Sequence, residues 1–311
     1  MTEAPRLPAA ADLLPAFAAR QIGALAEAVF PQEGGPVFDF TRPRGEAALT
    51  APDSVHWRVF KNPVSLYIGG VAAVILELAE PRVRTGVWEH SGFRQTPVRR
   101  LQSTGLAAMI SVYGPRSAAE AMIAGVVERH RTVRGVTPAG EPYAASDPDL
   151  LLWVQATTGL GFGDAYSRYV RPLTADDLDR LYAESEPSAL LYGVKDPPRT
   201  RAEIEAVLSR MAHRLAPSAI LDEFLQIMRT APAMPRALRP LQAMFVRAAV
   251  DMTPDWARER LALDPTLGLR PGEEVLIRQL GVAADRIPLP SSPAVRACVR
   301  LGLPADWLYR R

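Results

Sequence analysis

Proline placement constrains this chain more than any other feature of its sequence. In three places a residue that commonly caps a helix is followed directly by proline, as Asn62-Pro63, Thr96-Pro97 and Asp147-Pro148. Proline suits the first position of a helix because its φ angle is preset and the backbone N–H that it lacks has no partner there. Each pair therefore predicts the start of a helix.

Two further segments have the form of a capping box, Ser117-Ala-Ala-Glu120 and Thr200-Arg-Ala-Glu203. Between the helix starts, apolar residues recur at intervals of three and four, as in Met122, Val126 and Val127. No alternating pattern predicts the strands of a larger sheet. We expect an all-α protein, built as a single large helical bundle without internal repeats.

Composition excludes several classes of protein. The 311 residues are 48% hydrophobic and 23% charged, which is typical of a globular protein with a stable core. The net charge is only +2, and arginine is interleaved with acidic residues, so no nucleic-acid-binding face is expected. A single cysteine, Cys298, can form neither a disulfide framework nor a cysteine-based zinc site.

Two segments bear on where the protein is found. Met1–Ala11 contains Glu3 and two prolines and lacks a cationic start, so it does not have the pattern of a secretory signal. The longest apolar run, Val64–Ala79, is interrupted by Glu77 and is shorter than the roughly 20 residues that a bilayer span needs. We expect a buried core helix there, no transmembrane segment and a cytoplasmic protein.

The helix predicted to begin at Ser117 carries His130 near its end. His130 follows Val126 by four residues and precedes Val133 by three, so it shares a face with apolar side chains. Two interpretations remain open from this spacing, a hydrogen-bonded core histidine and a metal ligand.

The preceding helix, predicted from Pro97 to Tyr113, places Arg100 and Thr104 one turn apart. A guanidinium and a hydroxyl so placed can hold an anion such as a propionate, or polarise a bound oxygen species. The alternative is that Arg100 is solvated and Thr104 is a packing residue. Gly114 ends the helix and reverses the chain, so we expect Arg100, Thr104 and His130 to share one volume of the core.

The order of short motifs in the middle of the chain resembles a known family. The segment resembles the bacterial latex-clearing rubber oxygenases and the fungal membrane-bound oxygenase of mycophenolic acid biosynthesis. The residues that carry the resemblance are Trp57-Arg58-Val59-Phe60, Asn62-Pro63, Gly69-Gly70-Val71, Glu89-His90-Ser91-Gly92-Phe93, Arg100 to Thr104, Tyr113-Gly114, His130 to Gly135, Tyr143, Asp147-Pro148 and Trp153-Val154.

The resemblance implies an all-helical fold with a globin-like core, in which a b-type haem is used with dioxygen to cleave a carbon–carbon double bond of an isoprenoid chain. It also implies that His130 is the proximal ligand of the haem iron and that Arg100 and Thr104 belong to the cofactor site. Haem requires an axial side chain and an apolar slot. Gly69 and Gly70 would allow either a flat ligand or another helix to approach the backbone.

One position departs from the family pattern. The latex-clearing branch has a lysine just before the threonine, where this chain has Ser103. Serine is not a strong sixth ligand, which puts rubber cleavage itself in doubt. His90 is a candidate to take over the distal side, and Glu89 beside it could supply a base or proton relay. The alternative for His90 is a structural hydrogen bond that holds its loop to the bundle.

Three other signals have plainer structural interpretations. Gly159-Leu-Gly161-Phe-Gly163 follows a helix rather than a strand, so we interpret it as a bend and not as a nucleotide fingerprint. Asp176, Asp177 and Asp179 follow Thr174, an expected N-cap, where acidic groups favour the helix dipole and need no metal. Three aromatic residues are expected in the core rather than along a channel: Trp153, Tyr166 and Tyr169.

These observations predict a domain plan and a function. Residues 1–56 form an N-terminal helical extension, 57–196 a haem-oxygenase-like core, and 197–311 C-terminal helices packed on that core. The predicted function is that of a haem-b-dependent oxygenase acting on an apolar small molecule. The alternative is a non-catalytic or haem-free helical protein that retains the fold for binding, because a fold does not fix a function.

Overall fold

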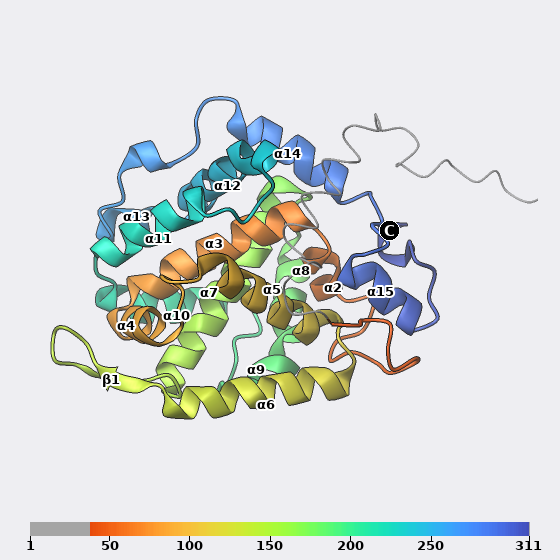
Figure 1. Ribbon diagram of the computed structural model, residues 1–311, viewed down its shortest axis with the longest axis horizontal. Helices are drawn as coiled ribbons and strands as arrows, with labels where there is room; N and C mark the ends of the chain where they lie inside the picture. Colours follow the sequence, from red (N-terminus) through yellow and green to blue (C-terminus); the bar gives the residue numbers. More distant parts are fainter. Residues whose placement is uncertain (1–37, 311) are drawn as a thin grey trace, which may run out of the picture.

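The structure is a computed structural model that describes residues 38–310, and helices make up most of it (Figure 1). The prediction of an all-α protein is confirmed. In chain order the helices are α2 (Val55–Phe60), α3 (Pro63–Ala79), α4 (Pro81–His90), α5 (Pro97–Tyr113), α6 (Arg116–Thr132), α7 (Pro148–Tyr169), α8 (Ala175–Glu184), α9 (Glu186–Tyr192), α10 (Arg201–Met211), η2 (Ala212–Arg214), α11 (Ala219–Thr230), η3 (Arg236–Leu238), α12 (Arg239–Met252), α13 (Asp255–Arg260), η4 (Pro265–Leu267), α14 (Glu273–Ala284), α15 (Pro293–Arg300) and η5 (Trp307–Tyr309).

Residues 38–54 contain no helix, and residues 1–37 of the predicted helical extension lie outside the described part of the chain. Two short strands, β1 (Arg134–Val136) and β2 (Pro142–Ala144), pair antiparallel after α6.

The helix starts predicted at proline are confirmed. The Asn62 Oδ1 atom accepts hydrogen bonds from the backbone N–H groups of Val64 and Ser65, and the Asp147 side chain caps α7 in the same way. Thr96 occupies the N-cap position of α5 without a side-chain capping bond. The capping boxes at Thr200 and, with Asp177 as its acid, at Thr174 are both formed.

The capping box predicted at Ser117 is wrong. Helix α6 begins one residue earlier, at Arg116, with Pro115 in the N-cap position. The backbone N–H of Ser117 donates instead to Glu46 Oε1 at 2.7 Å, across a long sequence separation. A carboxylate from a distant segment therefore takes the place of the local cap.

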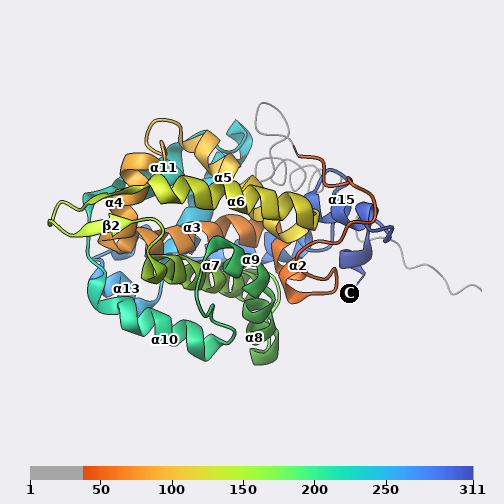
Figure 2. The ribbon, with the colours of Figure 1, turned by 90° about the horizontal axis from the view of Figure 1, so that it is seen from below.

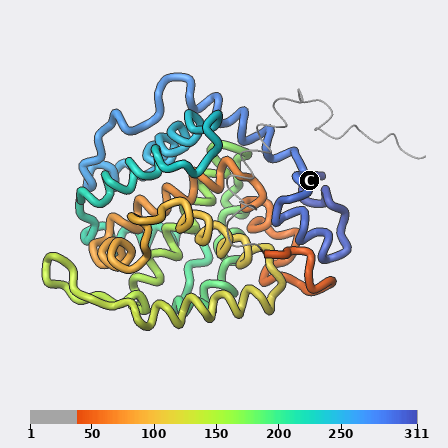
Figure 3. Tube along the Cα trace, in the orientation of Figure 1, coloured from red at the N-terminus to blue at the C-terminus, as the bar shows by residue number. Residues whose placement is uncertain are grey.

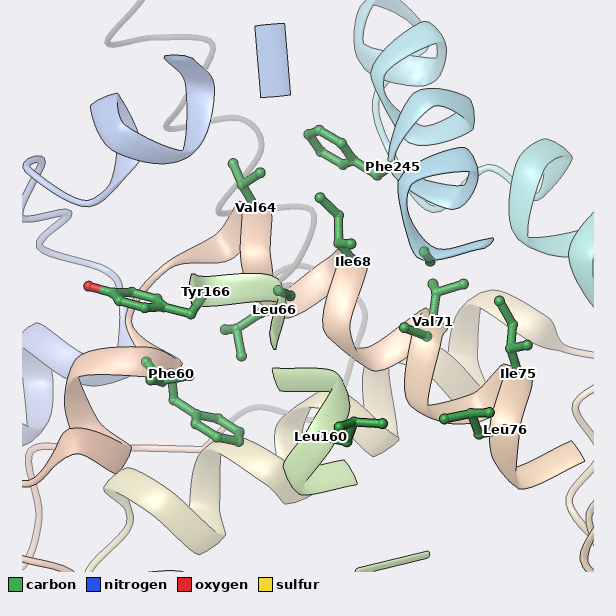
Figure 4. Packing of buried hydrophobic residues seen from close by; sticks show 14 of the residues in the cluster. Phe60, Val64, Leu66, Ile68, Val71, Ile75, Leu76, Leu160, Tyr166 and Phe245 are labelled. Atoms are coloured by element: carbon green, nitrogen blue, oxygen red, sulfur yellow. The ribbon is translucent and has the colours of Figure 1, made fainter. Parts of the chain in front are cut away.

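Helix α3 runs through the centre of the core. Val64, Ile68 and Ile75 have no exposed surface, and Figure 4 shows Ile68 beside Phe245 of α12. The apolar run is thus a buried core helix, as predicted. Within residues 38–310 no single helix is long and apolar enough to cross a bilayer; α3 and α4 meet that test only as a pair, and they are bent by 110° at their junction.

One close helix crossing in the core joins α3 to α7. A Cβ atom built at Gly161 would lie 2.5 Å from the Gly69 carbonyl oxygen, and one built at Gly69 would lie 2.7 Å from the Gly161 oxygen. The bend predicted at Gly159–Gly163 is wrong, because α7 is continuous there. These glycines serve helix packing: Gly159 and Gly163 lie against side chains of α8.

The helices after residue 200 pack against the same central pair. Helices α11, α12 and α14 contact α3, and α10 contacts α7, as the tube in Figure 3 shows. The aromatic residues predicted for the core are buried: Trp153, Tyr166 and Tyr169 have no exposed surface.

A buried polar network fastens the C-terminal segment to the α2–α3 junction. Lys61 Nζ lies 3.2 Å from Asp285 Oδ2 and also donates to the carbonyl oxygen of Leu308 at 3.1 Å. Tyr166 donates to the same carboxylate at 3.1 Å. Burial lowers the pKa of Lys61, and the nearby Asp285 charge opposes that shift. The paired charges therefore let a lysine lie in the core.

The hairpin of β1 and β2 extends beyond the helices at the lower left of Figure 1. Arg214 holds its second strand to the body, because the guanidinium binds both Glu141, just before β2, and the fully buried Glu80 at 3.0 Å. Arg82 donates to Glu80 at 2.9 Å as well. These contacts therefore anchor the hairpin to the body. The hairpin follows directly after α6, the helix that carries His130.

Candidate functional site

Helices α5 and α6 are consecutive and contact one another, and α9 lies along α6 (Figure 2). The reversal of the chain between α5 and α6 depends on Gly114, where a Cβ atom would lie 2.5 Å from the Ile110 carbonyl oxygen. Pro115 follows at once and starts the next helix. This turn places the first turn of α5, with Arg100, at the same end of the bundle as the last turn of α6, with His130.

His130 is partly buried, and its Nδ1 atom is buried without a hydrogen-bond partner among the described residues. Its pKa is lowered, first by burial and then by the positive charges of Arg100 and Arg129. The imidazole is therefore held in its neutral form, which keeps the lone pair that a metal ion requires.

Arg100 reaches solvent and forms no ion pair with any of the residues 38–310. Partial burial and the charge of Arg129 lower its pKa, whereas the carboxylate of Glu77 raises it. The Thr104 hydroxyl donates to the Arg100 carbonyl oxygen at 2.9 Å, and Ser103 donates to the same atom at 3.0 Å. Both hydroxyls are thus bonded to their own helix, whereas the Arg100 guanidinium forms no hydrogen bond with any of the residues 38–310.

Glu77 is the site residue that the sequence did not single out. It lies on α3, and the Thr158 hydroxyl of α7 donates to its Oε1 atom at 3.5 Å. Burial raises the pKa of Glu77 to about 7, although the Thr158 hydrogen bond and the Arg100 charge lower it. A single carboxylate inside an otherwise apolar, buried helix is the signal by which Glu77 could have been found.

His90 and Glu89 form a separate cluster. Both side chains are exposed at the end of α4, where the Tyr143 hydroxyl donates to Glu89 at 3.0 Å and lies 3.1 Å from His90 Nε2. No hydrogen bond among the described residues links either of them to His130. The contacts tie the end of α4 to the hairpin.

The two adjacent glycines of α3 have different surroundings. Gly69 lies in the crossing with α7, so its missing side chain is needed for helix packing. A Cβ atom at Gly70 would contact only the Phe162 ring, at 3.8 Å. A methyl group would therefore fit beside the α3 backbone at Gly70, in contact with Phe162, and would not fit at Gly69.

The donor set of the site fits one kind of metal group. Residues 38–310 contain no group of three or more histidine, cysteine or acidic side chains that could hold a metal ion. A single neutral imidazole cannot retain a free zinc ion, which needs three or four protein ligands. It suits haem iron, which arrives already coordinated by four ring nitrogens and takes one axial side chain.

The fold and the site define a class: an all-α protein in which the charge of Arg100 acts on a histidine, His130, and on a protonatable acid, Glu77. The chain belongs to the family described as ER-bound oxygenase mpaB/B'/Rubber oxygenase, catalytic domain, whose sequence model matches residues 57–286. No curated protein and no solved structure matches it. The family supports a general oxygenase role, with dioxygen and a small molecule as reactants.

Proposed function

We propose that this protein is a haem-b-dependent oxygenase that acts on an apolar substrate by oxidative cleavage of a double bond or a related oxygen insertion. An isoprenoid is the substrate class suggested by the family. The observation that carries the proposal is the neutral, partly buried His130 beside Arg100. The cytoplasmic location of the protein stays a prediction from the sequence.

His130 would hold the haem, and the bound haem would supply the chemistry of dioxygen activation. Arg100 brings a positive charge to the same end of the bundle, where it would attract an anionic group of the cofactor.

Glu77 is suited to hold and move a proton at its Oε atoms. A carboxyl group with a pKa of about 7 is present in both protonation states near neutral pH, which is the condition that general acid–base catalysis favours. Thr158 orients the carboxyl group through its hydrogen bond. Ser103, bonded to the Arg100 carbonyl oxygen, is not assigned a ligand role.

The proposal is tested on protein purified from haem-replete cells. A Soret band and a haem-to-protein ratio near one are expected. Colourless protein that takes up no added haemin would instead favour the haem-free binding protein.

Replacing Arg100 with lysine should reduce haem occupancy or turnover clearly while the apo protein keeps its stability. Arg100 makes no ion pair with the described residues, so the unfolding free energy should change by less than about 1 kcal/mol. Lysine keeps the charge and loses the planar fork that binds a carboxylate at two points. Apo melting temperature and haemin titration are measured side by side. Strong destabilisation with unchanged haem affinity would assign Arg100 to the scaffold.

Replacing Glu77 with glutamine should change how stability depends on pH. Because burial raises the pKa of Glu77 from 4.5 to about 7, the folded state keeps a proton that the unfolded state loses, so stability falls as pH rises through that window. Glutamine cannot ionise, and Glu77→Gln should be more stable than the wild type at pH 8, by on the order of 1 kcal/mol.

The check is urea unfolding at pH 5 and pH 8, with the exposed Glu259→Gln on α13 as control. An unchanged difference between the two pH values in Glu77→Gln would mean that Glu77 ionises as an ordinary surface acid.

A further inference from the structure

Tyr143 fastens the hairpin of β1 and β2 to α4, and the proposed function gives this contact no role. The Tyr143 side chain is buried although the hairpin is short and lies at the surface. Its hydroxyl donates to Glu89 Oε2 at 3.0 Å and lies 3.1 Å from His90 Nε2, both at the end of α4. Burial raises the pKa of Tyr143, and the hydrogen bond to Glu89 raises it further, so the hydroxyl keeps the proton that it donates.

Two glycines make room for the Tyr143 side chain. A Cβ atom built at Gly86 of α4 would lie 3.4 Å from the ring, and one built at Gly135 of β1 would lie 2.6 Å from the hydroxyl oxygen. Gly135 is also the residue that pairs with Tyr143 across the hairpin. A side chain at Gly135 would displace the hydroxyl, so the bond to Glu89 depends on glycine at this position.

The part of α6 that carries His130 lacks a fully buried side chain. The buried residues of α6 are Ala119 and Ile123, both in its first half, and its last turn is exposed apart from His130 itself. Helix ends fray. Packing of α6 alone therefore holds His130 only weakly, and a contact beyond the helix is needed to keep the imidazole in one place.

The hairpin supplies that contact through the backbone. Val133, the C-cap of α6, donates its N–H to the His130 carbonyl oxygen at 3.2 Å, and the Val133 carbonyl oxygen accepts the N–H of Ala145 at 2.9 Å. Ala145 lies two residues after Tyr143, directly after β2. A hairpin of two strands is marginally stable by itself, so its contacts with the body determine how firmly it holds the end of α6.

We propose that Tyr143 is a positioning residue for His130: by fastening the hairpin to α4, it fixes the last turn of α6 and with it the imidazole that would bind the haem iron. This inference rests on the proposed function. The hydroxyl of Tyr143 bonds to α4, so its effect on His130 passes through the backbone of the hairpin.

The test is Tyr143→Phe, which keeps the ring and removes only the hydroxyl. Haemin affinity, measured by absorbance titration, should fall about tenfold, the lower end of the effect of residues that orient a metal ligand. Amide hydrogen exchange of the apo protein should become faster in the hairpin and in the last turn of α6, and should stay unchanged in α3 and α7. Glu89→Ala removes the acceptor of the same bond and should produce both changes.

Tyr166→Phe is the matched control. Tyr166 donates to the Asp285 carboxylate at 3.1 Å, so this variant loses the same kind of bond in the network that holds the C-terminal segment. It should be less stable than the wild type in urea, while haemin affinity and hydrogen exchange in the last turn of α6 stay at their wild-type values.

Several results would overturn the proposal. Wild-type haemin affinity in Tyr143→Phe would show that the hydroxyl does not position His130, while the haem function stands. Equal losses of affinity in Tyr143→Phe and Tyr166→Phe would reduce the effect to general stability. Faster exchange confined to the hairpin would show that the hairpin does not hold the end of α6. A wild type that binds no haemin would remove the proposed function, and this inference with it.

Discussion

Replacing His130 with alanine is expected to abolish stable haem binding and to leave the helical fold intact. His130 would supply the protein's bond to the haem iron, so without it the haem would keep only weaker contacts. The fold loses little, because the buried Nδ1 atom of His130 has no hydrogen bond to lose among the described residues. We expect the unfolding free energy of the apo protein to change by less than about 1 kcal/mol.

The measurement is haemin titration and circular dichroism of the variant, with His90→Ala and His213→Ala as controls. His213 is exposed on η2, where its Nδ1 atom lies 2.9 Å from the Arg210 carbonyl oxygen, so its loss should be silent. His90 contacts Tyr143 rather than the site. An unchanged spectrum in His130→Ala combined with loss of haem in His90→Ala would move the axial ligand to the hairpin cluster.

The helix starts were predictable because they depend on neighbouring residues. Asn62-Pro63 and Asp147-Pro148 contain both the cap and the first helical residue, so no distant contact is needed to define them. The capping box predicted at Ser117 was wrong for the opposite reason. The carboxylate that serves its backbone N–H belongs to Glu46, 71 residues away, and the sequence gives no sign of that contact.

The site was predictable only in part. The turn at Gly114 brings Arg100 and His130 to one end of the bundle, but the predicted shared core volume is wrong, because Arg100 and Thr104 are exposed and His130 is only partly buried. Glu77 was missed because its role depends on which helices pack around α3, and that is decided by tertiary structure. The strands β1 and β2 are three residues each, too short for an alternating pattern to be recognised.

The glycines of α7 show how the same residues can support opposite interpretations. Glycine disfavours helix, which predicted a bend at Gly159–Gly163. The structure uses their small size instead, because the α3 and α7 backbones approach so closely that no side chain fits between Gly69 and Gly161. The energy lost in helix propensity is offset by packing between two central helices.

Replacing Gly161 with alanine should therefore destabilise the protein strongly. The new Cβ atom would lie 2.5 Å from the Gly69 carbonyl oxygen and 3.1 Å from the Ala73 side chain. The nearer neighbour is helix backbone, which cannot rotate away as a side chain can, so α3 and α7 would have to separate. Overpacking of this kind costs about 1–3 kcal/mol.

Gly70→Ala is the matched test of that argument, because it adds the same methyl group one residue from the crossing. The new Cβ atom would meet only the Phe162 ring at 3.8 Å, an ordinary contact, and alanine favours helix by roughly 0.5–1 kcal/mol. Urea unfolding of the apo proteins should show Gly161→Ala less stable than the wild type and Gly70→Ala equal to it or more stable. If both variants shift the urea midpoint alike, helix propensity and not the backbone contact determines their stability. If Gly70→Ala keeps its stability and loses haem affinity, the added methyl group obstructs the cofactor without disturbing the fold.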